Sequence, residues 1–243
     1  MTVDKTIRIN KYLSEKGYCS RREADKLIEQ GKVTVNGELS VLGTKICDSD
    51  EVCVNGEIVL QQKKKKIYLA FHKPVGVVCT TDKKREKNNI IDYINYPTRI
   101  FPIGRLDKLS EGLIFLTNDG DIVNKILRAR NNHEKEYEVT VNKPVTKEFI
   151  NSMSEGIPVL DTITRKCKAK QTGKKTFKIT LTQGLNRQIR RMCDYLGYDV
   201  KKLKRIRIMN IKLDVSVGKY RNFTNKELKA INQAVKNSTK TFE

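Results

Sequence analysis

The sequence predicts an α+β protein in two parts: a small module of two helices and a small sheet, and a larger domain on a mixed, largely antiparallel sheet. Three observations predict this division. Residues 1–60 hold two helical patterns followed by two short strand patterns. Residues 61–66 (QQKKKK) then read as a basic linker, with or without contacts of its own. From residue 67 to 243, strand patterns outnumber helical ones and tight turns join most neighbours, which is typical of an antiparallel-rich sheet.

The two helices of the small module have clear boundaries in the sequence. The first follows an apolar repeat at helical spacing and is expected to end at Gly17, a suitable residue for the end of a helix. Ser20 should begin the second, because Glu23 follows three residues later and completes the capping-box pattern. Three basic residues lie off the apolar stripe of this second helix, where they can face phosphate: Arg21, Arg22 and Lys26.

Two hairpins should follow these helices. The segments KVTVNGE (32–38) and EVCVNGEIV (51–59) each contain an Asn-Gly pair between strand-like residues. Asn-Gly favours the type I′ turn, whose twist matches that of the flanking strands. The shared pattern indicates reused hairpin chemistry rather than a repeated domain.

The larger domain reads as strands with helices interspersed. A Pro-Gly turn divides residues 67–81 into two strands, and a bulge is expected near Ile208 and Met209. Asn186 is expected to cap the third helix of this domain. The segment 111–120 is predicted to be a short buried strand that ends in an Asp-Gly turn at Asp119. The remaining predicted strands are residues 101–103, 135–141, a long hairpin that turns at 172–175, and 200–213. The predicted helices are residues 121–131, 146–156, 186–197 and 224–235.

The charge of the chain points to a polyanionic partner. Lys and Arg total 49 against 28 Asp and Glu, a formal net charge of +21. A membrane surface is the competing partner, but no stretch approaches the roughly 20 apolar residues of a spanning helix, and the first residues lack the apolar core of a signal peptide. We therefore expect a cytoplasmic, nucleic-acid-directed monomer.

Cysteine and histidine are scattered. The six cysteines form no C-x-x-C pair, and the chain has 2 histidines, His72 and His133. This spacing disfavours a zinc site and a disulfide framework, so we expect no metal and no cofactor. A nucleophilic pair of Cys79 and His72 is formally allowed, but on the predicted strand–turn–strand it is better explained as structural.

A charged cluster, Arg105 and Asp107, comes just before one of the most apolar runs of the chain. Asp107 could be a turn residue, a helix cap or a catalyst. Because the loop that carries it lies between two predicted buried strands, its ends are pinned and the carboxylate can be held with little freedom, as catalysis requires.

These motifs also resemble a known family. Residues 20–38 resemble an S4-type RNA-binding module, and GRLD (104–107) resembles the motif that carries the aspartate of pseudouridine synthases. Together with KPVG, KEYEV, QGLNRQIRRM and GKYRNFT, the resemblance spans nearly the whole chain. It is to the RsuA-type ribosomal RNA pseudouridine synthases, especially the RluF-like members that act on the large subunit. His72 stands where this family often has Asn, and Tyr220 where Trp is common.

The resemblance implies specific roles. Asp107 would be the essential carboxylate, Tyr137 would pack against the uracil ring, and Arg190 would pair with Asp107. An attack of Asp107 on the sugar, an attack on the base, and action as a base all stay open. The implied RNA contacts are Arg105, which would enter the stack behind the flipped uridine, the phosphate contacts Lys73 and Arg187, and the small module's Arg21, Arg22 and Lys26.

The function implied is isomerisation of specific uridines to pseudouridine in structured RNA. Large-subunit ribosomal RNA is the expected substrate, and transfer RNA is a further candidate. The alternative is a non-catalytic RNA-binding or ribosome-assembly protein on the same fold, which the basic module would fit equally well. A nuclease or glycosidase is a weaker third reading, because it would usually need metal ligands or paired carboxylates.

Overall fold

The structure is a computed structural model that describes residues 6–60, 65–82 and 86–238. The chain divides into two compact units, residues 1–66 and 67–243. The segment 61–66, expected to be a linker, lies largely outside the described residues. In the described part of the chain, no helix is both long enough and apolar enough to cross a membrane.

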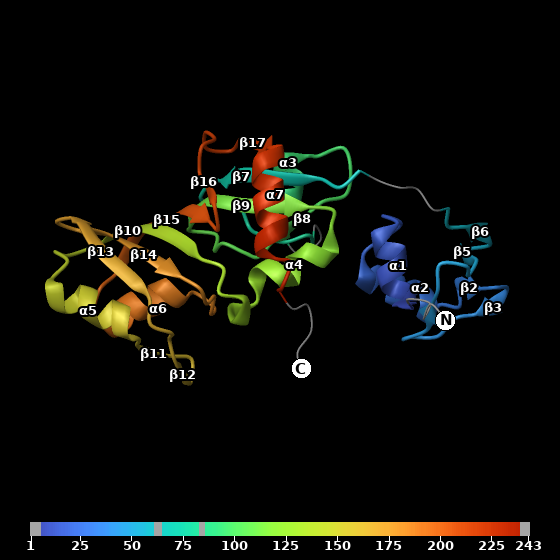
Figure 1. The fold of residues 1–243 in the computed structure, drawn as a ribbon, viewed down its shortest axis with the longest axis horizontal. Coiled ribbons are helices and arrows are strands. Elements are labelled where there is room, and N and C mark those ends of the chain that lie inside the picture. Colours follow the sequence, from blue (N-terminus) through green and yellow to red (C-terminus); the bar gives the residue numbers. More distant parts are fainter. Residues whose placement is uncertain (1–5, 61–64, 83–85, 239–243) are drawn as a thin grey trace. The chain divides into compact units, whose positions relative to one another are not determined.

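The small unit packs two helices against short strands (Figure 1). Its largest sheet has the strand order β3-β2-β5-β6, and every neighbouring pair is antiparallel. The elements are β1 (Ile7–Arg8), α1 (Ile9–Glu15), α2 (Arg21–Glu29), β2 (Val33–Val35), β3 (Glu38–Leu39), β4 (Lys45–Ile46), β5 (Val52–Val54) and β6 (Glu57–Ile58). One sheet face and both helices share a core that includes Leu13, Ala24, Ile28, Val33 and Val54.

Local sequence signals set the boundaries of these elements as predicted. The Glu23 backbone N–H donates to the Ser20 hydroxyl at 3.2 Å, and the Ser20 N–H donates to the Glu23 carboxylate, which completes the capping box. Both Asn-Gly turns form, with Asn36 and Asn55 at φ of 51° and 52°. The predicted hairpins are therefore confirmed.

The large unit is built on one twisted sheet. Its strand order is β13-β14-β10-β15-β9-β7-β17, with β16 paired to β15 and β8 paired to β9. Within that order β9 and β15 run parallel and the other neighbours are antiparallel, which confirms a mixed, largely antiparallel sheet. The strands are β7 (Tyr68–Lys73), β8 (Phe101–Ile103), β9 (Glu111–Thr117), β10 (Lys135–Val141), β13 (Lys168–Gly173), β14 (Thr176–Leu181), β15 (Val200–Ile208), β16 (Ile211–Lys212) and β17 (Tyr220–Asn222).

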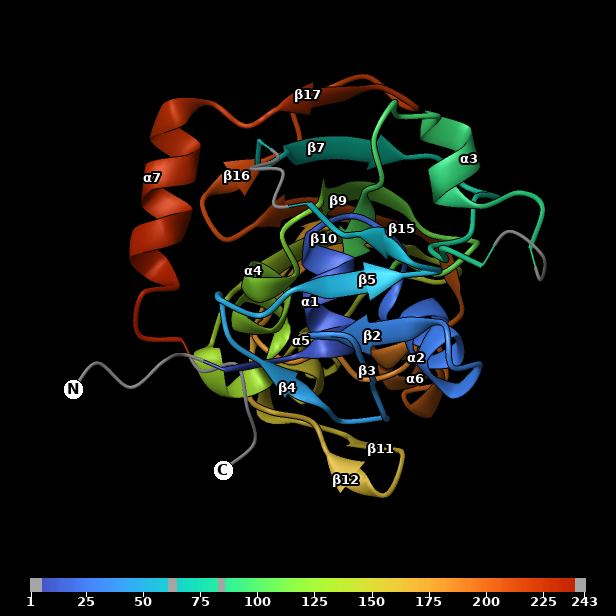
Figure 2. The ribbon, with the colours of Figure 1, turned by 90° about the vertical axis from the view of Figure 1, so that its right-hand side faces the viewer.

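Helices cover both faces of the half of the sheet that contains β7 and β9. Tyr68 and Ala70 of β7 pack with α4 and α7, whereas Leu69 and Phe71 pack with α3 on the opposite face. Figure 2 shows α7 and α3 on opposite sides of the β7–β17 edge. All six residues of β7 are buried for this reason. The helices are α3 (Ile90–Ile94), α4 (Gly120–Leu127), α5 (Lys147–Glu155), α6 (Gln188–Tyr195) and α7 (Asn225–Ala234), with a 3₁₀ turn at Ala129–Asn131.

The other half of the sheet has its own core. Phe149 and Met153 of α5 and Ile189 and Met192 of α6 pack against β10, β14 and β15. Figure 1 shows α5 and α6 together beside β10, β13 and β14. A small hairpin, β11 (Pro158–Val159) and β12 (Thr162–Ile163), follows α5 and was not predicted.

Several local predictions were wrong. The second strand after the Pro-Gly turn is reduced to an isolated bridge between Val78 and Asn89. Asp119 caps α4 by accepting the Asp121 N–H at 3.1 Å, so the Asp-Gly pair begins a helix rather than turning a hairpin. The predicted strand 200–213 is two antiparallel strands, β15 and β16, joined by a turn at Met209 and Asn210. The bulges of β15 lie at Lys201 and Ile206 instead of near Ile208 and Met209.

The start of α6 also differs from the prediction. Its N-cap is Arg187, in the left-handed region at φ 50°, and Asn186 precedes it. Asn186 accepts two bonds from Arg191, at its backbone oxygen (3.1 Å) and its side-chain oxygen (3.4 Å), and therefore does not cap the helix. Gln188 accepts the Leu185 N–H at 3.0 Å and closes the turn that leads into α6.

Candidate active site

The loop between β8 and β9, residues 104–110, carries Asp107 and is held from outside by backbone contacts. The Leu106 N–H donates to Cys79 Sγ at 3.4 Å. The Gly76 N–H of the Pro-Gly turn donates to the Lys108 carbonyl at 2.7 Å. Within the loop, the Ser110 N–H donates to the Asp107 carbonyl at 3.0 Å. These bonds fix the backbone on both sides of Asp107, so its carboxylate has little freedom.

Arg190 of α6 ties this loop to the rest of the sheet. Its Nη2 donates to the Leu109 carbonyl at 3.0 Å and to Ser110 Oγ at 3.3 Å, and its Nη1 donates to the Val200 carbonyl at 3.2 Å. Its Nε lies 3.8 Å from Asp107 Oδ2, as an ion pair longer than a hydrogen bond. Burial and the neighbouring Arg187 charge lower the pKa of Arg190, but an arginine stays protonated.

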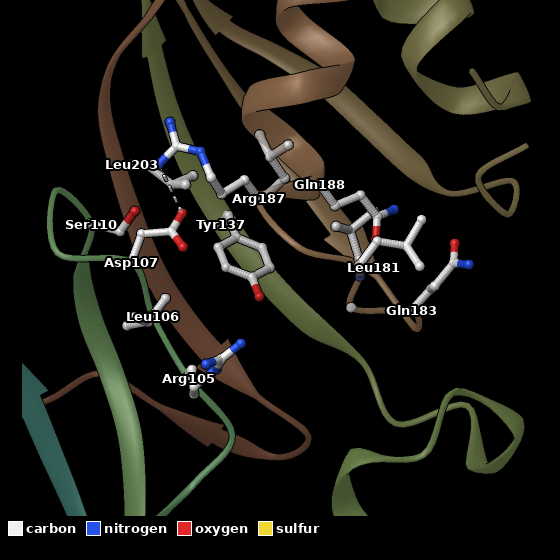
Figure 3. Close-up of a pocket in the computed structure, with 13 residues that line it drawn as sticks. Arg105, Leu106, Asp107, Ser110, Tyr137, Leu181, Gln183, Arg187, Gln188 and Leu203 are labelled. Atoms are coloured by element: carbon white, nitrogen blue, oxygen red, sulfur yellow. Dashed lines mark hydrogen bonds and ion pairs between the residues drawn. The ribbon is translucent and has the colours of Figure 1, made fainter. Parts of the chain in front are cut away.

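Arg187 lies on the other side of the carboxylate. Its Nη1 is 3.9 Å from Asp107 Oδ2, and its side chain is 45% exposed. Figure 3 shows this ion pair beside the Tyr137 ring. The left-handed backbone at Arg187 is unusual for an arginine, and such strained conformations often lie at functional sites. Asp107 thus faces two cations: Arg190, whose side chain is 11% exposed, and Arg187, which reaches solvent.

Tyr137 forms a wall of the pocket into which Asp107 points (Figure 3). It comes from β10, and its ring packs against the cores of both halves of the sheet. The pocket has a volume of about 90 Å³. It is lined by the Asp107 loop, by the sheet residues Tyr137, Leu181 and Leu203, and by the turn into α6.

The predicted RNA contacts of the large unit differ in placement. Arg105 is exposed at the pocket, where it is free to meet RNA. Lys73 is fully buried, and its Nζ donates to the Pro74 carbonyl at 2.7 Å. The predicted phosphate contact of Lys73 is therefore wrong in this structure, because its ammonium group does not reach the surface. Burial lowers the pKa of Lys73, and the negative charge of Asp107 opposes that effect.

The predicted RNA contacts of the small unit lie together on one helix. Arg21, Arg22 and Lys26 are exposed on α2, away from its buried residues Ala24 and Ile28. Arg21 Nη2 donates to Asn10 Oδ1 at 3.3 Å. The structure therefore separates the predicted site residues into two sets, one in each compact unit.

Four polar residues of the site region were not predicted. Ser110 and Gln188 are buried at the loop and at the turn into α6, while Lys135 and Arg205 are buried in the sheet. A serine three residues after Asp107 and a glutamine beside Arg187 are weak signals, since both residue types are usually exposed. A strand pattern likewise treats a lone Lys or Arg as facing solvent.

His72 and Cys79 contact other residues rather than forming a nucleophilic pair. His72 Nδ1 lies 2.9 Å from the Val215 carbonyl, and its Nε2 lies 3.8 Å from Glu111. Burial raises the pKa of the Cys79 thiol, which disfavours the thiolate. Across the described residues, no three or more His, Cys, Asp or Glu side chains gather as a metal site would require.

Comparisons with known proteins match both units. Residues 67–195 match the RNA pseudouridylate synthase family, and residues 7–40 match the S4 domain. The chain superposes on a crystal structure of a pseudouridylate synthase with a TM-score of 0.69 at 30% identity, covering 93% of this chain and 99% of that one. The expected S4-like module and catalytic fold are thereby confirmed.

Two curated relatives match nearly the full chain. This chain is 54% identical over 241 residues to the dual-specificity RNA pseudouridine synthase RluF of Escherichia coli strain K12. The alignment covers 98% of this chain and 83% of the relative. It is 35% identical over 233 residues to the ribosomal large subunit pseudouridine synthase B of Bacillus subtilis, with coverage of 92% and 95%.

Proposed function

The chain belongs to the RNA pseudouridylate synthase family, and we propose that it isomerises specific uridines of structured RNA to pseudouridine. The observation that carries this proposal is the placement of Asp107. Its carboxylate points into a pocket beside Tyr137, lies 3.8 Å from Arg190, and sits on a loop that backbone contacts fix in place. A carboxylate held this way is preorganised for reaction.

The reaction moves the uracil ring from one attachment to another. The bond from C1′ to N1 breaks, a bond from C1′ to C5 forms, and the proton of C5 is lost while N1 gains one. Asp107 is the proposed carboxylate for this exchange; attack on the sugar, attack on the base, and action as a base all agree with its position. The positive charges of Arg190 and Arg187 lie beside the Asp107 carboxylate and stabilise its negative charge. Tyr137 would pack against the ring during the exchange.

The target uridine must leave its stack to enter the pocket. Extruding a base costs a few kcal/mol, and a side chain that fills the vacated space offsets that cost. Arg105 supports this role, because it is exposed and lines the pocket only two residues before Asp107. Arg187 is the proposed phosphate contact on the opposite side of Asp107, since its guanidinium reaches solvent.

Large-subunit ribosomal RNA is the proposed substrate, and transfer RNA a further candidate. Relatives are named a large-subunit synthase and a dual-specificity RNA synthase. The S4 domain, with exposed Arg21, Arg22 and Lys26, would supply affinity for the RNA backbone. We propose residues 1–60 as this RNA-binding domain, 61–66 as a basic linker and 67–243 as the catalytic domain, in a cytoplasmic monomer that needs no cofactor.

The test is release of tritium from RNA that contains 5-tritiated uridine. We expect release by the purified protein with no added metal and in excess chelator, because a carboxylate supplies the proposed chemistry. Mapping of pseudouridine in total RNA, with and without the protein, would then identify the target. A wild-type protein that binds RNA and releases no tritium would refute the enzymatic proposal and favour the assembly-protein alternative.

A further inference from the structure

A buried arginine lies directly behind the pocket. Arg205 of β15 is 3% exposed, and its Nε donates to the Leu113 carbonyl of β9 at 2.6 Å. Its Nη2 is buried and has no hydrogen-bond partner among the described residues. The guanidinium carbon lies 5.9 Å from the centroid of the Tyr137 ring. Arg205 thus links the strand that leads out of the Asp107 loop to the ring that forms the pocket wall.

The backbone around Arg205 is adapted to this placement. Tyr137 of β10 pairs with Arg205, but the preceding Glu136 pairs with Arg207, so Ile206 is an extra residue in β15. Such a bulge re-aims the side chains on either side of it. On the other neighbouring strand, a Cβ atom at Gly112 would collide with the backbone of Arg205, so only glycine allows this approach.

The surroundings of Arg205 are positively charged. Lys135, two residues before Tyr137 on β10, is 7% exposed, and its Nζ donates to the His133 carbonyl at 3.3 Å. Burial and then the charge of Arg205 lower the pKa of Lys135 to about 8. The pKa of the buried Lys73 is lowered mainly by burial, and the charge of Arg205 contributes to the same effect. Arg205 is therefore buried within range of two buried lysines, Lys73 and Lys135.

This arrangement is unfavourable for stability. A buried N–H with no partner costs roughly 1–3 kcal/mol, and replacement of buried charges by apolar residues of similar volume is often neutral or stabilising. A methionine at position 205 would avoid both the unpaired N–H and the repulsion from Lys135, and would lose the hydrogen bond to the Leu113 carbonyl. A residue that folding alone does not favour is a candidate for a role in the reaction.

We propose that Arg205 is a positioning residue for the isomerisation and acts through Tyr137. The inference rests on the proposed function. The guanidinium lies over the Tyr137 ring, so it limits the positions that the ring can adopt relative to Asp107.

The test compares four proteins: wild type, Arg205→Met, Tyr137→Leu and the double variant. Single-turnover tritium release gives the rate, filter binding gives the RNA dissociation constant, and thermal unfolding gives Tm. We expect Arg205→Met to slow release by about 10–100-fold, with the dissociation constant changed less than about twofold and Tm unchanged or higher. Lys202→Met removes an exposed cation from the same strand and is the matched control, with the wild-type rate expected.

The double variant separates positioning through Tyr137 from a direct effect. If Arg205 acts through the ring, Arg205→Met should slow the Tyr137→Leu background by less than about twofold. Fully additive losses would overturn the proposal, as would a wild-type rate in Arg205→Met. A parallel fall in Tm and rate would also overturn it, because that result marks Arg205 as structural. Tritium release by wild type in the same experiment shows that the proposed function itself holds.

Discussion

The protein uses positive charge in two opposite ways. In the small unit, Arg21, Arg22 and Lys26 lie exposed on α2. In the large unit, Lys135 and Arg205 are buried in the sheet. The residue types are the same, but the cost of placing the charge differs greatly.

The difference indicates what each set is suited to do. An exposed cation attracts phosphate over a distance, is screened by salt, and can be replaced by another cation nearby. A buried cation has lost its water, so it keeps a fixed position and acts strongly at short range. The exposed set is suited to general affinity for RNA. The buried set is suited to one step of the reaction at one base.

The largest effect should come from the carboxylate that lies between two cations. Asp107→Asn should lower tritium release at least about 1,000-fold, because a neutral amide is a far poorer nucleophile and base. The ion pairs at 3.8 and 3.9 Å are long and partly exposed, so stability should fall by less than about 1 kcal/mol. Release at the wild-type rate would disprove the catalytic assignment. Asp161→Asn, at an exposed turn, is the control and should behave as wild type.

Substitution of Arg190 tests how much a cation in a fixed position contributes to the reaction. Arg190→Lys keeps the charge but loses the fork that reaches the Leu109, Ser110 and Val200 oxygens. We expect release to slow by about 10–100-fold and Tm to fall, with RNA affinity little changed. Arg191→Lys is the matched control, because that side chain contacts Asn186 on the exposed side of the helix. Equal effects of the two substitutions would argue against a special position for Arg190.

Removal of the exposed set should weaken binding and leave chemistry intact. With Arg21, Arg22 and Lys26 all changed to Ala, the magnitude of the slope of log affinity against log salt should fall by roughly 2.1–2.7, from about 0.7–0.9 for each lost phosphate contact. The rate at saturating RNA should stay near that of wild type. Lys45→Ala alters an exposed cation elsewhere in the same unit and serves as the control. An unchanged slope would mean that this helix face makes no phosphate contacts.

The smallest effect is a change of stability with pH. Because burial lowers the pKa of Lys135 to about 8, the folded protein holds this proton less tightly than the unfolded chain does. Stability should therefore rise between about pH 8 and 10.5, where only the unfolded chain keeps the proton. Lys135→Met should reduce this rise to the part that the buried Lys73 contributes, and should be more stable at pH 7, by up to about 3 kcal/mol. Urea unfolding at pH 7.5 and 9.5 measures both; the same rise in the variant would contradict the assignment.

Sequence reasoning succeeded where the cause is local. The Ser20–Glu23 capping box and the Asn-Gly turns depend on residues at most three apart, so the chain specifies them directly. The placement of Asp107 on a pinned loop was also predictable, because strong apolar patterns flank it on both sides. The neighbouring Arg190 was identified by a family resemblance rather than by spacing.

The failures come from contacts between distant parts of the chain. A lysine such as Lys73 reads as a surface residue, and nothing within the adjacent sequence indicates that the sheet closes over it. Arg205 is buried because β15 enters between β9 and β10, which is a property of the sheet order. Asp119 was read as a turn because its Asp-Gly pair suits both a hairpin and a helix start.

The parallel pairing of β9 with β15 also has a consequence for synthesis of the protein. Arg205 lies 92 residues beyond the Leu113 carbonyl that it contacts. At about 5–20 residues per second, the ribosome takes roughly 5–18 s to make that stretch. During this interval β8 can pair with Phe115–Thr117 of β9, but the start of β9, at Glu111 and Gly112, still lacks its β15 partner. Pairing between such distant segments is intrinsically slow. The pocket is therefore among the last features of the large unit to form, so a growing chain has its Asp107 loop long before it has an assembled site.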